Sequence, residues 1–106
     1  MRILLKLRSR LPIDETDVAY ILEDLHRGKS LIPPHAIPNK PLLTRWDPGQ
    51  PLNAANCVVL DVVELKKHLE GLQNGKTADE VWGEEVSQLM KRRQVEAREW
   101  MAKIMD

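Results

Sequence analysis

The sequence predicts a small α+β domain, in which two packed helices cover a sheet of two to three strands and a long amphipathic helix follows. Three observations lead to this prediction. A strand-like alternation opens the chain, two capped helical patterns each follow an apolar run, and a charged helical pattern covers residues 77–105. The expected order of elements is β-α-β-β-α-α. A chain of 106 residues is long enough for one hydrophobic core, so residues 1–106 are expected to form a single domain.

The first two expected elements are a strand and a helix. Residues 2–8 alternate with a period of two, which is typical of a half-buried strand. A helix is expected over residues 15–27, because Asp14 can cap its first turn and apolar residues recur from Val18 at helical spacing. Gly28 can end this helix in a left-handed turn.

The middle of the chain, residues 29–56, carries six of the seven prolines and is therefore expected to be irregular. Residues 42–46 are its best candidate for a short strand. The segment 31–38 has two interpretations, which the sequence leaves open. It is either an extended segment that a partner recognises, or a covering loop whose Ile32 and Ile37 fill the core.

Another apolar run begins at Cys57 and ends at Leu60. Asp61 and Glu64 can then form a capping box, which predicts a helix over residues 62–72. Because Cys57 is the only cysteine, an intrachain disulfide is excluded. Its apolar neighbours favour a buried, inert thiol.

The last predicted helix covers residues 77–105 and opens with a capping box at Thr77 and Glu80. Its apolar face is interrupted over residues 91–94. At about 1.5 Å per residue this helix would measure about 43 Å. A compact domain of this size is about 35 Å across. We therefore expect the distal half of the helix to extend beyond the core, unless the helix kinks at the interruption and returns to the sheet.

The leading functional hypothesis follows from that distal half. An apolar patch that its own domain does not cover is typical of a contact surface. We therefore expect a non-enzymatic protein-binding module, an adaptor, regulator or inhibitor whose partner is a second copy of the chain in a homodimer, a different protein, or both. Small charge-balanced domains of this kind are common among proteins encoded by phages and other mobile elements, which is an association that no residue demonstrates. The expected partner-binding residues are Ala97, Trp100, Met101 and Ile104.

Nucleic-acid binding is the first alternative. The 16 Lys and Arg residues balance the 16 Asp and Glu residues, so binding to a polyanion would have to be local. Basic residues on the long helix can neutralise phosphates, while Glu96 and Glu99 lie among them. A second basic group lies within residues 2–10. The candidate residues on the helix are Lys91, Arg92, Arg93 and Arg98.

A small enzyme of unfamiliar type is the second alternative, and no set of residues indicates a reaction. His26, His35 and His68 lack the close spacing of a zinc site, so neither a metal nor a cofactor is expected. No serine lies in a nucleophile elbow, and the scattered glycines form no phosphate loop. A pocket that gathers His35, His68 and carboxylates would favour this alternative.

A cytoplasmic protein is expected. No stretch approaches the roughly 18 apolar residues of a membrane span. The basic N-terminal residues lack the apolar core of a signal peptide. The single cysteine fits a reducing compartment.

Overall fold

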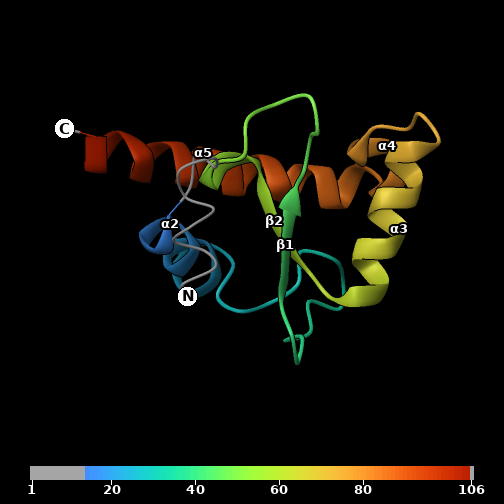
Figure 1. Cartoon of the computed structure of the whole chain (residues 1–106), viewed down its shortest axis with the longest axis horizontal. Helices are drawn as coiled ribbons and strands as arrows, with labels where there is room; N and C mark the ends of the chain where they lie inside the picture. The colour runs from blue at the N-terminus through green and yellow to red at the C-terminus, as the bar shows by residue number, and fades with distance from the viewer. Residues whose placement is uncertain (1–13, 106) are drawn as a thin grey trace.

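The computed structural model describes residues 14–105, and this part of the chain is α+β (Figure 1). The predicted helices and strands from residue 15 to residue 73 are confirmed, with ends shifted by a few residues. The strand predicted over residues 2–8 lies outside the described residues. The elements in order are α2 (Glu15–Ala19), the π-helical η1 (Tyr20–Leu25), β1 (Leu42–Arg45), the 3-10 helix η2 (Ala54–Asn56), β2 (Cys57–Leu60), α3 (Val62–Gln73), α4 (Ala78–Trp82) and α5 (Glu84–Met105).

Strands β1 and β2 form an antiparallel pair in which Leu42 lies opposite Leu60. Every residue of β2 is buried. Because successive side chains of a strand point to opposite faces, Cys57 and Val59 lie on one side of the sheet and Val58 and Leu60 on the other. The prediction that Cys57 is buried is confirmed, and burial raises the pKa of its thiol to about 12.

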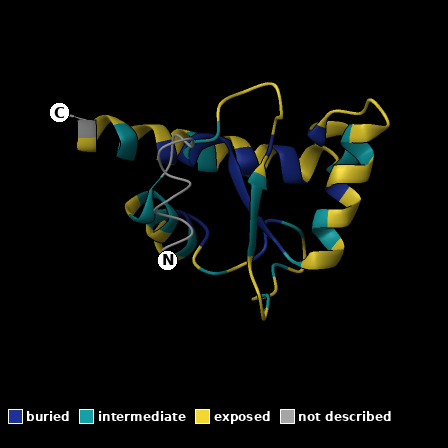
Figure 2. Cartoon of the chain, in the orientation of Figure 1, coloured by how far each residue is buried: buried dark blue, intermediate teal, exposed yellow. Residues whose placement is uncertain are grey.

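The two faces of β2 belong to two hydrophobic clusters, and α5 contributes to both. Figure 2 shows β2 and the adjoining parts of α5 among the buried segments. The first cluster forms around Cys57 and Val59 and the second around Val58 and Leu60. The first also contains Ile21, Leu25, Ala54, Ala55 and Ala97, and the second Leu31, Trp46, Ala78, Val86 and Met90.

The expectation that the distal half of α5 lies outside the core is wrong for Ala97, Trp100 and Met101, which pack in or against the first cluster, whereas the C-terminal end of the helix runs past α2 (Figure 1). Its 22 residues measure about 33 Å, and the longest dimension of the molecule is 34 Å. Ala97 is fully buried in the first cluster. The ring of Trp100 stacks on Tyr20, with ring centroids 3.9 Å apart and planes within 2°. The described residues include no helix long and apolar enough to cross a membrane.

The single helix predicted over residues 77–105 is interrupted at Gly83, and α5 is continuous through residues 91–94. Gly83 has φ 89° and ψ 176°, a conformation that is essentially restricted to glycine. Its amide donates to the carbonyl of Asp79 at 2.8 Å and so ends α4. Its carbonyl accepts from the amide of Ser87 at 3.1 Å and from the Ser87 hydroxyl at 2.8 Å, which starts α5. The break shortens the helix and turns it along the sheet.

Part of the segment 31–38 is packed in the core, and part of it is exposed. Leu31 is buried, and Ile32 packs against the second cluster. Ile37 is 70% exposed. The covering-loop interpretation is therefore right for Ile32 and wrong for Ile37.

Replacing Gly83 by alanine tests the helix break through the sign of its effect. We expect Gly83→Ala to lower the free energy of unfolding by about 1–3 kcal/mol, because alanine is strained at this φ and ψ. In an uninterrupted helix the same change would raise stability by about 1 kcal/mol. Urea unfolding followed by circular dichroism measures the difference. Gln88→Ala, an exposed change on α5, is the control, and a more stable Gly83→Ala variant would contradict the break.

Candidate functional site

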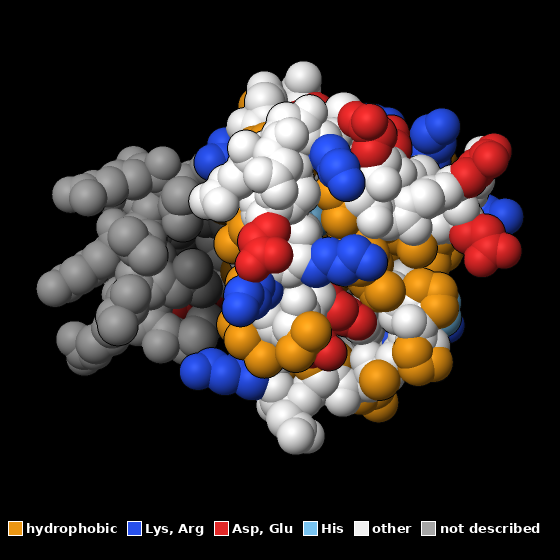
Figure 3. Space-filling view, turned by 90° about the vertical axis from the view of Figure 1, so that its right-hand side faces the viewer, with side chains coloured by type: hydrophobic (Ala, Val, Ile, Leu, Met, Phe, Trp, Pro, Cys, Tyr) orange, Lys and Arg blue, Asp and Glu red, His pale blue; other side chains and the backbone are white. Residues whose placement is uncertain are grey.

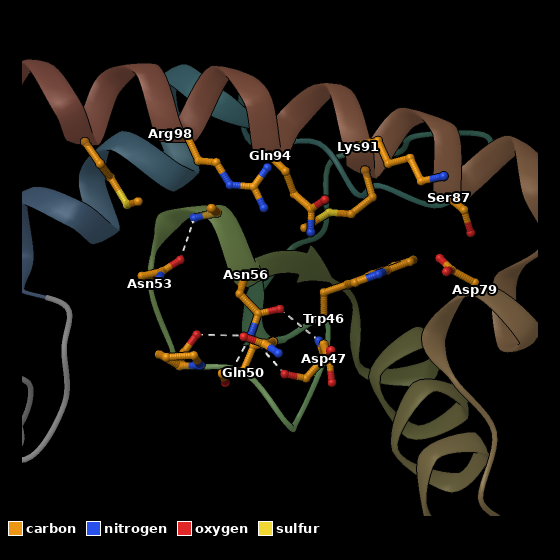
Figure 4. A pocket seen from close by; sticks show the side chains of 14 residues that line it. Trp46, Asp47, Gln50, Asn53, Asn56, Asp79, Ser87, Lys91, Gln94 and Arg98 are labelled. Carbon is orange, nitrogen blue, oxygen red and sulfur yellow. Dashed lines mark hydrogen bonds between the residues drawn. The ribbon is translucent and has the colours of Figure 1, made fainter.

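A polar cleft of about 370 Å³ lies between α5 and the loop that joins β1 to β2 (Figure 4). One wall is a face of α5, and the other is the loop over residues 47–56. The polar cleft is lined by charged and amide side chains, which suit a polar ligand. The main polar residues are Lys91, Gln94 and Arg98 from α5, and Asp47, Gln50, Asn53 and Asn56 from the loop.

The α5 wall carries two positive charges. Lys91, Gln94 and Arg98 are spaced i, i+3 and i+7, which places them on one face of the helix. Arg98 and Gln94 reach from α5 toward the loop, whereas Lys91 extends along the helix toward Ser87 and Asp79 (Figure 4). Both cationic side chains are exposed. The cleft can therefore offer charge and hydrogen bonds to an anionic group without moving the backbone.

The loop wall is organised by the buried side chain of Asn56. Its amide N–H groups donate to the carbonyls of Asp47 at 2.9 Å, Gln50 at 3.2 Å and Pro51 at 3.0 Å. Its Oδ1 accepts from the amide of Asp47 at 2.9 Å. Asn53 adds a local bond, because its Oδ1 accepts from the amide of Ala55 at 2.9 Å and caps η2. The Asn56 side chain thus makes the hydrogen bonds that a neighbouring strand would provide if this loop were part of a sheet.

Two carboxylates also line the cleft. Asp79 and Asp47 line it together with Lys91 and Arg98. Asp47 is tied to its own loop, since its Oδ1 accepts from the amide of Gly49 at 2.9 Å. Asp79 lies near the end of the Lys91 side chain in Figure 4, whereas Arg98 lies at the far end of the cleft. Negative charge therefore opposes an anion least near Arg98.

His68, one of the two histidines whose gathering in a pocket would favour an enzyme, is a core residue. Its Nε2 donates to the carbonyl of Arg45 at 3.0 Å, and the indole N–H of Trp82 donates to its Nδ1 at 3.0 Å. Because an indole nitrogen only donates, this pair of bonds assigns the proton to Nε2. Burial lowers the pKa of His68, and the bond to Arg45 partly offsets that effect.

The condition set for an enzyme, a pocket that gathers His35, His68 and carboxylates, is not met among the described residues. His35 lines a different cavity, next to His26. Nor does any group of three or more His, Cys, Asp or Glu within residues 14–105 have an arrangement that could hold a metal ion.

The structure separates the four candidate nucleic-acid-binding residues. Lys91 and Arg98 line the polar cleft, Arg93 lines a second cavity, and Arg92 lines neither. Helical geometry explains this, because each residue turns the side-chain direction by about 100°. Positions 91 and 98 therefore lie on the same face of α5, and position 93 lies on the opposite face. The pair seven residues apart was visible in the sequence, whereas the loop wall built on Asn56 had no sequence signal.

The four candidate partner-binding residues lie in different environments. Ala97 is fully buried and cannot contact another protein. Trp100 and Met101 are half-buried and pack against the first cluster. Ile104 is 54% exposed. Partner binding by Trp100, Met101 and Ile104 stays a prediction.

Substitution of Asn56 tests its role in the loop wall. We expect Asn56→Ala to lower the free energy of unfolding by about 3 kcal/mol, because several buried loop groups lose their partner. Asn56→Asp keeps the shape but turns a carboxylate oxygen toward carbonyls, so its loss should be similar at pH 7 and smaller near pH 4. Urea unfolding at both pH values measures this, with Asn53→Ala as a control that should cost about 1 kcal/mol. If Asn56→Ala lowers the free energy of unfolding by less than about 1 kcal/mol, Asn56 does not stabilise the loop as described.

Comparison with known proteins gives one informative match. No protein-family model matches the chain, and no solved structure matches it. Over 86 residues the chain is 35% identical to tRNA threonylcarbamoyladenosine dehydratase 2 of Saccharomyces cerevisiae. The alignment covers 80% of this chain and 19% of the yeast protein. The chain therefore spans about one fifth of this relative, and the similarity is to one segment of a larger protein.

Proposed function

We propose that this chain is an RNA-binding segment related to part of a tRNA threonylcarbamoyladenosine dehydratase, and that the polar cleft contacts tRNA. The observation that carries the proposal is the similarity over 80% of this chain to a protein named for a nucleoside of tRNA. Because the chain corresponds to 19% of that protein, we propose binding rather than catalysis for it. The nucleic-acid alternative thereby moves ahead of the protein-binding hypothesis.

The chemistry of the polar cleft supports this choice of ligand. RNA offers phosphate oxygens to Arg98 and Lys91, and base and ribose edges to the amide of Gln94. The indole of Trp46 also borders the cleft but is only 7% exposed, so it provides little surface for base stacking. Recognition would therefore rest on charge and hydrogen bonds more than on the stacking used by many single-strand-binding proteins.

The charge distribution restricts where RNA can bind. On the side of the molecule that carries α3 and α4, side chains of both signs lie among hydrophobic ones (Figure 3). The chain as a whole has a formal net charge of zero. A polyanion is therefore not attracted by a general field, and contact depends on local cations. Arg98 is the stronger candidate for a phosphate contact, because Asp79 lies near the end of the Lys91 side chain and far from Arg98 (Figure 4).

Binding of a tRNA that carries threonylcarbamoyladenosine tests the proposal. We expect Arg98→Gln to weaken binding about tenfold, as loss of one charge-assisted hydrogen bond predicts. Adding Lys91→Gln should reduce the slope of log K against log salt concentration by about one unit for each charge removed. Fluorescence anisotropy over a series of salt concentrations measures both quantities, and the same tRNA without the modification shows whether the nucleoside is recognised.

The control is the double variant Lys40→Gln, Lys66→Gln. It removes two exposed positive charges that lie outside the polar cleft. We expect it to keep the affinity and the salt slope of the wild type. An equal loss in both double variants, or no binding of tRNA by the wild type, would contradict a tRNA site in the cleft.

A protein contact is the second candidate, and one observation favours it. Ile37, Val62 and Val63 are 70%, 69% and 73% exposed and line a common hollow of about 600 Å³. Exposed apolar side chains gathered in this way are typical of a contact surface. This candidate keeps the expected homodimer but moves its surface from the distal part of α5 to the start of α3. No observation favours an inhibitor or a mobile-element origin.

Light scattering after size-exclusion chromatography tests this second candidate. We expect a dimer that Val63→Asp dissociates, because a carboxylate would be buried in an apolar interface. Lys66→Asp, an exposed change on the same helix, is the control. Trp100→Ala should leave the mass unchanged, since Trp100 stacks on Tyr20 of its own chain. A wild-type monomer at all concentrations would exclude the homodimer.

A further inference from the structure

A second cavity, of about 300 Å³, lies on the other side of α5 from the polar cleft. It is bounded by the segment that follows η1, by residues 29–35 and by α5. The lining residues that the structure describes include three with permanent or nearly permanent positive charge and none with a carboxylate. We call it the basic cavity, and its polar residues are His26, Arg27, Lys29, Ser30, His35 and Arg93.

His26 leaves one ring nitrogen unused inside the protein. The side chain is 4% exposed, and its Nε2 has no hydrogen-bond partner. Burial and then the charge of Arg93 lower the pKa of His26 to about 4. A hydrogen bond between its ring and the Cys57 backbone partly offsets these two effects. A buried polar atom without a partner costs about 1–3 kcal/mol, and native proteins contain few of them. This nitrogen is therefore available to a ligand in the basic cavity.

Arg93 shows the same deficiency from the opposite wall. Its Nε is buried and has no hydrogen-bond partner. One terminal nitrogen lies 3.6 Å from a Glu96 oxygen, which is a long contact within one helix. The guanidinium keeps its charge and can only donate. A ligand in the basic cavity must therefore supply an acceptor, and the cationic lining favours one with negative charge.

We propose that the basic cavity binds a phosphate group, held by Arg93 and Lys29, with one phosphate oxygen sharing a proton with Nε2 of His26. Phosphate offers several acceptor oxygens at once, and one of them can also carry a proton. This matches the basic cavity, where Arg93 can only donate, Nε2 of His26 can donate or accept, and Arg27 and Lys29 add positive charge. The group is therefore a free phosphate or a phosphate monoester, because the phosphodiester of an RNA backbone is fully ionised at pH 7 and carries no proton to share.

This inference goes beyond the proposed tRNA contact in the polar cleft and does not depend on it. It rests on residues that face the other side of α5, chiefly His26 and Arg93. Lys91 and Arg98 do not line the basic cavity. Failure of tRNA binding in the cleft and failure of phosphate binding here can therefore be measured separately.

Titration with inorganic phosphate at pH 7, followed by the ¹⁵N resonance of His26 Nε2, tests the proposal. We expect this resonance to shift and saturate as the site fills. Arg93→Gln should weaken phosphate binding about tenfold. Arg92→Gln is the matched control, since it removes the same charge from the neighbouring, exposed position and should change little. Lys29→Gln, a change at an exposed residue of the site, provides a second variant if Arg93→Gln does not fold.

Competition identifies the source of the phosphate. Displacement by adenosine monophosphate but not by adenosine, with no effect of a short RNA lacking terminal phosphates, assigns a free or terminal phosphate. Equal displacement by that RNA would contradict the proposal, since its phosphodiesters carry no proton for Nε2 of His26. The proposal is also overturned if His26 Nε2 does not respond to phosphate, or if Arg92→Gln and Arg93→Gln weaken binding equally. The Lys91→Gln, Arg98→Gln variant should bind phosphate as the wild type does.

Discussion

Strand β2 is buried on both faces, and this constraint determines the position of α5. A two-stranded sheet cannot cover itself, so another element has to close each side. Helix α5 serves both sides, because Val86 and Met90 join the cluster on one face and Ala97 joins the cluster on the other. These contacts hold α5 along the sheet from Val86 to Ala97. Its remaining faces border the polar cleft and the basic cavity, so both candidate sites result from the way the core is closed.

Buried polar groups in this protein fall into two kinds. Asn56 and His68 have complete sets of partners and connect irregular segments to the sheet and the helices. Such satisfied groups stabilise a single arrangement of the backbone. His26 Nε2 and Arg93 Nε are buried with no partner. Since the same chain satisfies the first kind so fully, the second kind is better explained by a ligand than by poor packing.

The two candidate sites share one helix and divide its basic residues between them. Three consecutive basic residues on a helix do not form one patch, because each residue turns the side-chain direction by about 100°. On α5 they are separated, so that Lys91 joins Arg98 on the polar cleft while Arg93 enters the basic cavity. This division allows an RNA strand to be held at one face of α5 and a phosphate at another, although the chain carries no net charge. Similarity to a segment of a yeast tRNA dehydratase fits this arrangement.

The sequence by itself determined the local elements, because caps and periodicity act over a few residues. The capping boxes of Asp61 and Thr77 form as predicted, and the buried run from Cys57 to Leu60 is a strand. Tertiary structure decided whether Gly83 would continue a helix or end one, since both are compatible with glycine. It also decided that Ala97 and Trp100 belong to the core, and it alone brought Asn56 to its loop and His26 to Arg93. These contacts join segments distant in the chain, and a local pattern carries no information about them.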